Sequence, residues 1–233
     1  MERLDKLLAG TGRWSRREVK DMIRLGRVGV DGRAAARPEE KCAAEAVITV
    51  DGERIACGGL LYLMLHKPAG YISATDDPKQ TTVLELLPEH LRRVGLFPAG
   101  RLDKDTEGLL LLTNDGVLAH ELLSPKKHVD KTYFVRVDGQ LDREDTAAFA
   151  SGMTLADGYT CLSAGLELLE RPDEALVTLR EGKYHQIKRM LAARGKPVVY
   201  LKRLTMGPLT LDEGLLPGQW RELTPQERAA LGR

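Results

Sequence analysis

The chain has 233 residues, of which 42% are hydrophobic, and a formal net charge of +1. It is long enough for one large domain or for a small and a medium one, and its total charge does not by itself indicate a nucleic-acid-binding protein. No apolar run approaches the roughly 20 residues of a membrane-spanning helix, which excludes an integral membrane protein.

The cysteines indicate a reducing compartment. There are three of them, Cys42, Cys57 and Cys161, and no two have the spacing of metal ligands. An odd number without such spacing favours free thiols in the cytoplasm and no metal site. Residues 1–20 are charged throughout, so we expect no signal peptide.

Two stretches of the chain are strongly basic although the whole is nearly neutral. Residues 11–37 carry eight Lys and Arg against three acidic residues, and residues 180–203 carry eight against Glu181 alone. Separated basic patches on a near-neutral protein indicate contact with a polyanion.

The first 58 residues predict a compact αα-β unit. We expect a helix over 2–10 and a second over 16–25, with Ser15 as N-cap, Glu18 at the capping-box position, and Val19, Met22, Ile23 and Leu25 as apolar positions. Short strands follow within 27–32 and at 47–50, each ending in Asp-Gly. Gly58-Gly59 is the expected linker.

The remainder of the chain, residues 60–233, predicts a larger domain in which strands dominate. Strands are expected at 60–65, 109–112, 131–137, 166–169, 175–180, 198–204 and 219–223, and helices at 82–87, 117–123, 143–151 and 184–194. Several strands follow one another like hairpins, which favours an α+β domain with a mixed, mainly antiparallel sheet flanked by helices.

A charged loop precedes the buried strand at 109–112. In this loop Asp103 lies between Arg101 and Lys104. An exposed loop closed by salt bridges is the ordinary interpretation of such a pattern. A loop attached to a buried strand can also hold one carboxylate rigidly at a site, and the pattern alone leaves both open.

Longer motifs carry a resemblance to known families. Residues 2–56, with Arg3-Leu4-Asp5-Lys6-Leu7-Leu8 and Ser15-Arg16-Arg17-Glu18, resemble an S4 RNA-binding domain. Residues 60–230 resemble the catalytic domain of the RsuA family of pseudouridine synthases, in the strings 100–109, 131–133 and 181–190. Thr75-Asp76-Asp77-Pro78 and 186–190 are most similar to the branch that acts on the small ribosomal subunit.

The resemblance implies an isomerase that turns a uridine of rRNA into pseudouridine without cofactor or metal. Asp103 would be the catalytic carboxylate, attacking C1′ or removing the C2′ proton, and both routes stay open. Lys188 would be its cationic partner. Tyr133 would stack on the uracil of a nucleotide that has left its stack.

The resemblance also implies residues that bind RNA. Arg101 would handle the flipped nucleotide, although a salt bridge to Asp103 or Asp105 is an equal alternative. Lys131 would bind RNA or substrate, and Gln186 and Ile187 would shape the pocket. A lone His185 at a helix start favours a structural role. In the N-terminal module, phosphate contact is expected from Arg13, Arg16, Arg17, Lys20, Arg24 and Arg27, the alternative being a solvated helix face.

These expectations give a monomeric cytoplasmic enzyme whose partner is rRNA or an immature ribosomal particle, with 16S rRNA of the small subunit preferred. A large-subunit synthase of the same family and a non-catalytic S4-type assembly factor are the alternatives. A carboxylate-based hydrolase would need a second positioned acid, and the sequence offers none.

Overall fold

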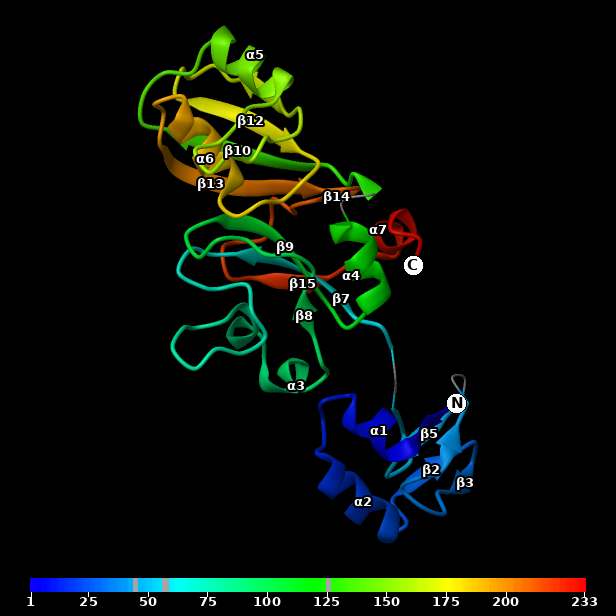
Figure 1. Cartoon of the computed structure of the whole chain (residues 1–233). Helices are drawn as coiled ribbons and strands as arrows, with labels where there is room; N and C mark the ends of the chain where they lie inside the picture. The colour runs from blue at the N-terminus through cyan, green and yellow to red at the C-terminus, as the bar shows by residue number, and fades with distance from the viewer. Residues whose placement is uncertain (44–45, 56–58, 125–126) are drawn as a thin grey trace. The chain divides into compact units, whose positions relative to one another are not determined.

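The computed structural model describes residues 1–43, 46–55, 59–124 and 127–233. Its contacts form two units, Met1–Leu61 with Leu84–Phe97, and Tyr62–Val83 with Pro98–Arg233 (Figure 1). Of the predicted linker, Gly58 lies outside the described residues, as does Cys57, so the boundary between residues 1–58 and 60–233 stays a prediction. No described helix is long and apolar enough to cross a membrane.

The first unit contains three short helices, a four-stranded sheet and a separate two-stranded pair. Its elements are β1 (Glu2–Arg3), α1 (Leu4–Ala9), α2 (Arg16–Arg24), β2 (Val28–Val30), β3 (Arg33–Ala34), β4 (Lys41–Cys42), β5 (Ile48–Val50), β6 (Glu53–Ile55) and α3 (Glu89–Arg92). The sheet has the order β3-β2-β5-β6. The helix predicted over 2–10 starts later, because Glu2 and Arg3 pair with β4 instead.

Helix α2 has the predicted N-terminus. The Ser15 hydroxyl accepts from the Glu18 amide at 3.3 Å, and the Glu18 carboxylate accepts from the Ser15 amide at 2.6 Å, which completes a capping box. Val19, Met22 and Ile23 are buried as predicted. Leu25 is not, since it ends the helix and is 72% exposed.

The second unit is built on a large mixed sheet. Among the described residues this sheet has nine strands, in the order β11-β12-β10-β13-β9-β7-β15 with β14 and β8 attached. The strands are β7 (Tyr62–Lys67), β8 (Phe97–Pro98), β9 (Glu107–Thr113), β10 (Lys131–Val137), β11 (Gly165–Leu168), β12 (Glu174–Leu179), β13 (Val198–Met206), β14 (Leu209–Thr210) and β15 (Trp220–Glu222). The predicted α+β class is confirmed.

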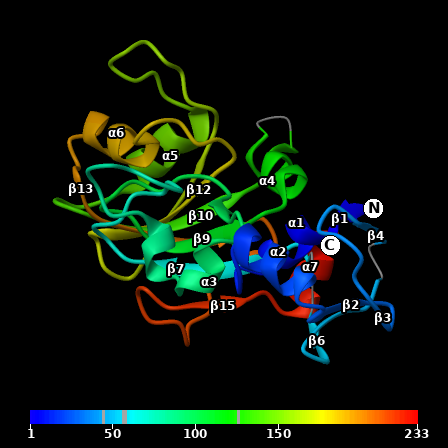
Figure 2. The same cartoon turned by 90° about the horizontal axis from the view of Figure 1, so that it is seen from below.

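Helices flank this sheet. They are α4 (Gly116–Leu123), α5 (Arg143–Ser151), α6 (Gln186–Ala193) and α7 (Pro225–Ala230). The 3₁₀ turn η1 (Val83–Leu86) lies where the chain passes from the second unit into Leu84–Phe97 of the first. Both views show α5 and α6 beside the half of the sheet that contains β10 and β12 (Figures 1 and 2). The helix predicted over 82–87 is therefore only a 3₁₀ turn. The one predicted over 184–194 starts at Gln186, because His185 adopts a left-handed backbone.

One parallel pair joins the two halves of the sheet. Along the strand order every neighbouring pair is antiparallel except β9 with β13, whose register is Lys202 to Glu107 and Arg203 to Gly108. Gly108 has φ +104, and a Cβ there would lie 2.2 Å from the Arg203 carbonyl oxygen. Because parallel strands start at the same edge, the segments that precede β9 and β13 are brought together.

Strand β10 alternates as its sequence predicts. Lys131, Tyr133, Val135 and Val137 are buried, and the residues between them are half-buried. In β9 the predicted buried run, residues 109–112, has no exposed side chain. The two strands give rigid supports for the charged loop and for Tyr133.

Candidate active site

Asp103 lies in the loop before β9 and meets Lys188 of helix α6. Asp103 Oδ2 is 3.1 Å from Lys188 Nζ, and the two side chains are 26% and 21% exposed. Lys188 also donates to Asp105 Oδ1 at 2.5 Å. The pair predicted from the sequence is therefore brought together, and Lys188 serves two carboxylates.

Its carboxylate partners stabilise the charged form of Lys188. Burial lowers its pKa, but hydrogen bonds to Asp105 and Asp103 oppose burial, and the net pKa is raised above the usual value for lysine. Burial likewise raises the pKa of Asp105, and the bond to Lys188 reverses this to a net lowering. The bond between Lys188 and Asp105 thus favours the charged form of both groups at neutral pH.

The Asp103 loop is anchored through its main chain by Lys67, the last residue of β7. Lys67 is fully buried, and its Nζ donates to the carbonyls of Pro68 at 3.0 Å, Lys104 at 3.2 Å and Thr106 at 2.8 Å. Burial lowers the pKa of Lys67 to about 8, with Asp105 the largest opposing influence. At neutral pH the ammonium is retained, which gives a donor for each carbonyl.

A second anchor holds the residue before Asp103. The Ser73 hydroxyl donates to the Leu102 carbonyl at 3.0 Å, and the same oxygen accepts from the Leu102 amide at 3.0 Å. The Thr106 amide donates to the Asp103 carbonyl at 3.1 Å. Both anchors hold the main chain around Asp103 through contacts that do not involve its side chain.

A cavity of about 80 Å³ opens beside Asp103, and we call it the catalytic hollow because Asp103 is the carboxylate expected to act in catalysis. Its lining consists of Arg101, Leu102, Asp103, Thr106, Tyr133, Leu179, Glu181, Gly182, Lys183, His185, Gln186, Ile187, Lys188 and Leu201. Tyr133 is 9% exposed there. The hollow offers an aromatic ring and aliphatic walls beside a carboxylate, which suits a flat base attached to a sugar.

Gln186 and Ile187 contribute to the wall of the catalytic hollow in different ways. The Gln186 amide donates to Glu181 Oε1 at 2.6 Å, and its own oxygen accepts from the Lys183 amide at 3.0 Å. Ile187 is 4% exposed. Gln186 therefore fixes the loop over 181–183, and Ile187 supplies apolar surface.

Comparison with known proteins agrees with this arrangement. A model of the RNA pseudouridylate synthase family matches residues 61–193, and a model of the S4 domain matches residues 2–48. The chain belongs to the RNA pseudouridine synthase family.

Known relatives of this synthase match nearly its whole length. It is 49% identical to the uncharacterized RNA pseudouridine synthase YtzG of Bacillus subtilis, over 97% of this chain and 96% of that one. It is 42% identical to the ribosomal small subunit pseudouridine synthase A of Salmonella typhimurium, over 99% of this chain and all of that one. A crystal structure of a pseudouridylate synthase is 36% identical, with a TM-score of 0.71 and coverage of 99% and 100%.

Arg101 lines the catalytic hollow of the synthase without binding a carboxylate. The alternative from the sequence was a salt bridge to Asp103 or Asp105, and neither pair forms in the part of the chain that the structure describes. Lys131 is 8% exposed and donates to the Val129 carbonyl at 2.8 Å. Both cations border open space, as an RNA-binding role requires.

His185 is closer to the chemistry than its sequence indicates. Its Nε2 lies 3.6 Å from Asp103 Oδ1, and its ring stacks on Tyr184 with centroids 3.8 Å apart. Its φ of 48 is a conformation that side-chain-bearing residues adopt only occasionally. A structural role was the expectation for His185, and the structure instead places its ring beside Asp103.

The basic residues of the S4 domain fall into two groups. Arg24 pairs with Asp21 at 3.1 Å and Arg27 with Asp51 at 2.5 Å, while Arg13 lies 3.8 Å from Glu53. Within the described ranges, Arg16, Arg17 and Lys20 have no ion pair, and both arginines are exposed. The second group is the one available for phosphate contact.

Proposed function

We propose that this synthase converts a uridine of small-subunit rRNA into pseudouridine and that Asp103 is its catalytic carboxylate. The observation that carries the proposal is the 3.1 Å pair between Asp103 and Lys188, in a hollow that Tyr133 also lines. The small-subunit target is supported by the name of the Salmonella relative. We expect a monomer that meets rRNA or an immature particle in the cytoplasm.

The reaction breaks the N1–C1′ bond and joins C5 of the same uracil to C1′. Asp103 either attacks C1′ or removes the C2′ proton, and in both routes its carboxylate acts at the sugar. Lys188 balances the negative charge beside it. No atom enters or leaves overall, so the site has only to hold the detached base while it turns.

Tyr133 and Arg101 would hold the target nucleotide. The uridine must leave its stack before Asp103 can reach the sugar. The ring of Tyr133 would then stack on the uracil, an interaction worth roughly 1–3 kcal/mol. Arg101 would take up the space or phosphate left by the nucleotide, as its lack of a carboxylate partner among the described residues allows.

The test compares Asp103→Asn with Asp105→Asn, two changes of the same kind in one loop. Each protein is incubated with small- and large-subunit rRNA transcripts and immature particles, and pseudouridine is mapped. Asp103→Asn should lose at least about 100-fold in rate, because the acting carboxylate is gone. Asp105 is 74% exposed, and its replacement should cost less than about tenfold.

Three results would contradict parts of the proposal. Product from Asp103→Asn at the wild-type rate would remove Asp103 from the chemistry. Product on large-subunit RNA alone would change the target. No product from wild type on any RNA, with binding intact, would instead indicate a non-catalytic assembly factor.

A further inference from the structure

A second, larger hollow adjoins the catalytic one, and we call it the basic hollow. Its volume is about 450 Å³. It shares Arg101, Tyr133 and residues 181–183 with the catalytic hollow. Its other lining residues are Gly100, Leu123, Lys131, Tyr159, Leu162, Arg180 and Arg203. Tyr133 thus borders both spaces.

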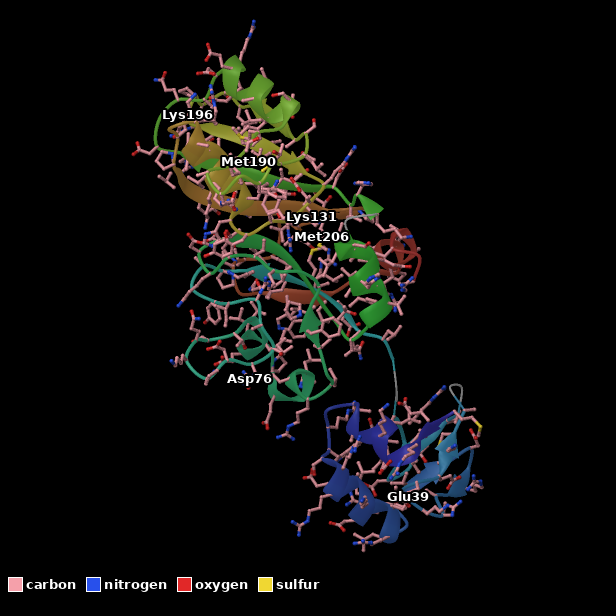
Figure 3. All side chains as sticks on the ribbon, viewed as in Figure 1. Glu39, Asp76, Lys131, Met190, Lys196 and Met206 are labelled. Atoms are coloured by element: carbon pink, nitrogen blue, oxygen red, sulfur yellow. The ribbon has the colours of Figure 1, made fainter. Side chains whose placement is uncertain are left out.

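Two of the cations that line the basic hollow are buried. Arg203 of β13 is 2% exposed and Lys131 of β10 is 8% exposed, and Figure 3 shows Lys131 on its strand opposite Met206 of β13. Arg203 Nε donates to the Leu109 carbonyl at 2.8 Å, while its Nη2 is buried without a hydrogen-bond partner. A buried, unpartnered guanidinium nitrogen is rare in a folded protein and calls for an explanation.

The nearby carboxylates are occupied elsewhere. Asp130 pairs with Arg180 at 2.9 Å, and Glu181 accepts from Tyr159 and from Gln186, each at 2.6 Å. Over the described residues neither Arg203 nor Lys131 forms an ion pair with a carboxylate. Burial, and then the charge of Arg203, lower the pKa of Lys131. The charge of Asp130 raises this pKa in part, but among the described residues neither buried cation has a carboxylate as its hydrogen-bond partner.

An anion from a bound ligand would pair with the buried charges of Arg203 and Lys131. Buried charge is costly unless it is paired and hydrogen-bonded, and a phosphate supplies both the charge and several acceptor oxygens. The guanidinium of Arg203 presents a planar set of donors that matches phosphate oxygens, and Lys131 adds a point charge. Both cations lie on adjacent strands whose register places Tyr133 opposite Arg203.

We propose that Arg203 and Lys131 bind a backbone phosphate of the RNA strand next to the target uridine, in the basic hollow. This inference rests on the proposed function, because it places the uracil against Tyr133 in the catalytic hollow. A phosphate fixed on the other side of Tyr133 sets the position of the strand relative to Asp103. Contacts of this kind position a nucleic acid without reading its sequence.

The experiment measures binding in an Asp103→Asn background, so that no conversion intervenes. Into it we introduce Lys131→Met and, as the matched control, Lys202→Met. Lys202 lies on β13 next to Arg203 but lines neither hollow. The dissociation constant for a small-subunit rRNA fragment is measured over a series of salt concentrations.

Lys131→Met should weaken binding roughly 10-fold, the effect of one lost charge-assisted contact. It should also reduce the slope of log K against log salt by roughly 0.7, the value for one phosphate of a single strand. Lys202→Met should leave both nearly unchanged. Arg203→Lys should weaken binding as well, because it keeps the charge and loses the planar donors, and its unfolding temperature shows whether the fold is intact.

A second measurement separates the RNA backbone from a free ion. Inorganic phosphate is added to the Asp103→Asn protein and to its Lys131→Met version at constant ionic strength, and thermal stability is followed. If phosphate stabilises only the protein that keeps Lys131 while both bind RNA equally, the hollow holds free phosphate and the backbone assignment is wrong. Equal affinity and equal salt slope for Lys131→Met overturn the proposal whether or not wild type makes pseudouridine, so the two hypotheses fail separately.

Discussion

The two basic stretches of the chain carry equal numbers of cations, eight each, but hold them in different ways. In residues 180–203, Lys188 is 21% exposed and Arg203 is buried, and each has fixed contacts. On α2, Arg16 and Arg17 are exposed, and the side chain of Arg24 is 74% exposed. Charge at a buried position acts on one group at close range, whereas exposed charge acts weakly on whatever approaches.

Buried cations and exposed cations should therefore differ in function, the first by positioning catalytic groups and the second by attracting RNA. Lys188 and Lys67 arrange the groups around Asp103, and their removal should change the reaction or the stability of the fold. The cations of α2 should change affinity and its dependence on salt. Removal of one cation at a time shows whether the effect of that cation follows its burial.

The largest effect is expected for Lys188→Met. Loss of the cation 3.1 Å from Asp103 should lower the rate of pseudouridine formation by about 100-fold, because a prearranged charge in the site is gone. Single-turnover kinetics with saturating enzyme measure this. Arg189→Met is the control on the same helix, since Arg189 pairs with Asp157 and lines neither hollow. Equal rates for the two variants would show that Lys188 is dispensable.

A large effect on stability is expected for Lys67→Met. Three main-chain carbonyls would lose their donor, and the free energy of unfolding should fall by about 3 kcal/mol. Urea denaturation at pH 7 measures it, with Lys79→Met on an exposed loop as the control. An unchanged midpoint would mean that the Asp103 loop needs no such anchor.

The same variant gives a pH test. The pKa of Lys67 is about 8 in the fold against 10.5 for a free side chain, so between these values the unfolded chain binds more protons. The contribution of Lys67 to stability therefore increases as the pH rises from about 8 toward 10.5. The stability difference between wild type and Lys67→Met should widen over that interval, and a constant difference would contradict the lowered pKa.

The smallest effect is expected on the S4 domain. Arg16→Ala with Arg17→Ala should weaken rRNA binding about 3- to 10-fold and reduce the salt slope by roughly 0.7 for each lost phosphate contact. Catalytic rate at saturating RNA should stay the same. Arg27→Ala is the control, because Arg27 already pairs with Asp51. A larger effect from Arg27 would mean that its surface pair opens to bind RNA.

Local pattern predicted the regular elements well. The alternation of β10 and the capping box at Ser15 were both confirmed, since each depends on residues close in sequence. The helix over 2–10 was predicted too long, because the pairing of β1 with β4 involves residues far along the chain. The start of α6 was predicted two residues too early because His185 adopts a left-handed backbone, which lies outside helical geometry.

The site was predicted through the family resemblance more than through pattern. The motifs named Asp103, Tyr133 and Lys188, and the structure brings all three to one hollow. No role was predicted for Lys67 or Arg203, because a cation within a strand gives no sign of which carbonyls it will meet. Their roles come from contacts between strands that only the folded chain defines.

The arrangement of the active site depends on Gly108, a residue without a side chain. Its missing side chain allows β9 to approach the Arg203 carbonyl, and only two registered residue pairs hold the two strands together there. An alanine at this position would separate the segments that carry Asp103 and Lys188 while leaving every reactive atom in place. One added methyl group would thus abolish activity although every residue of the site is unchanged.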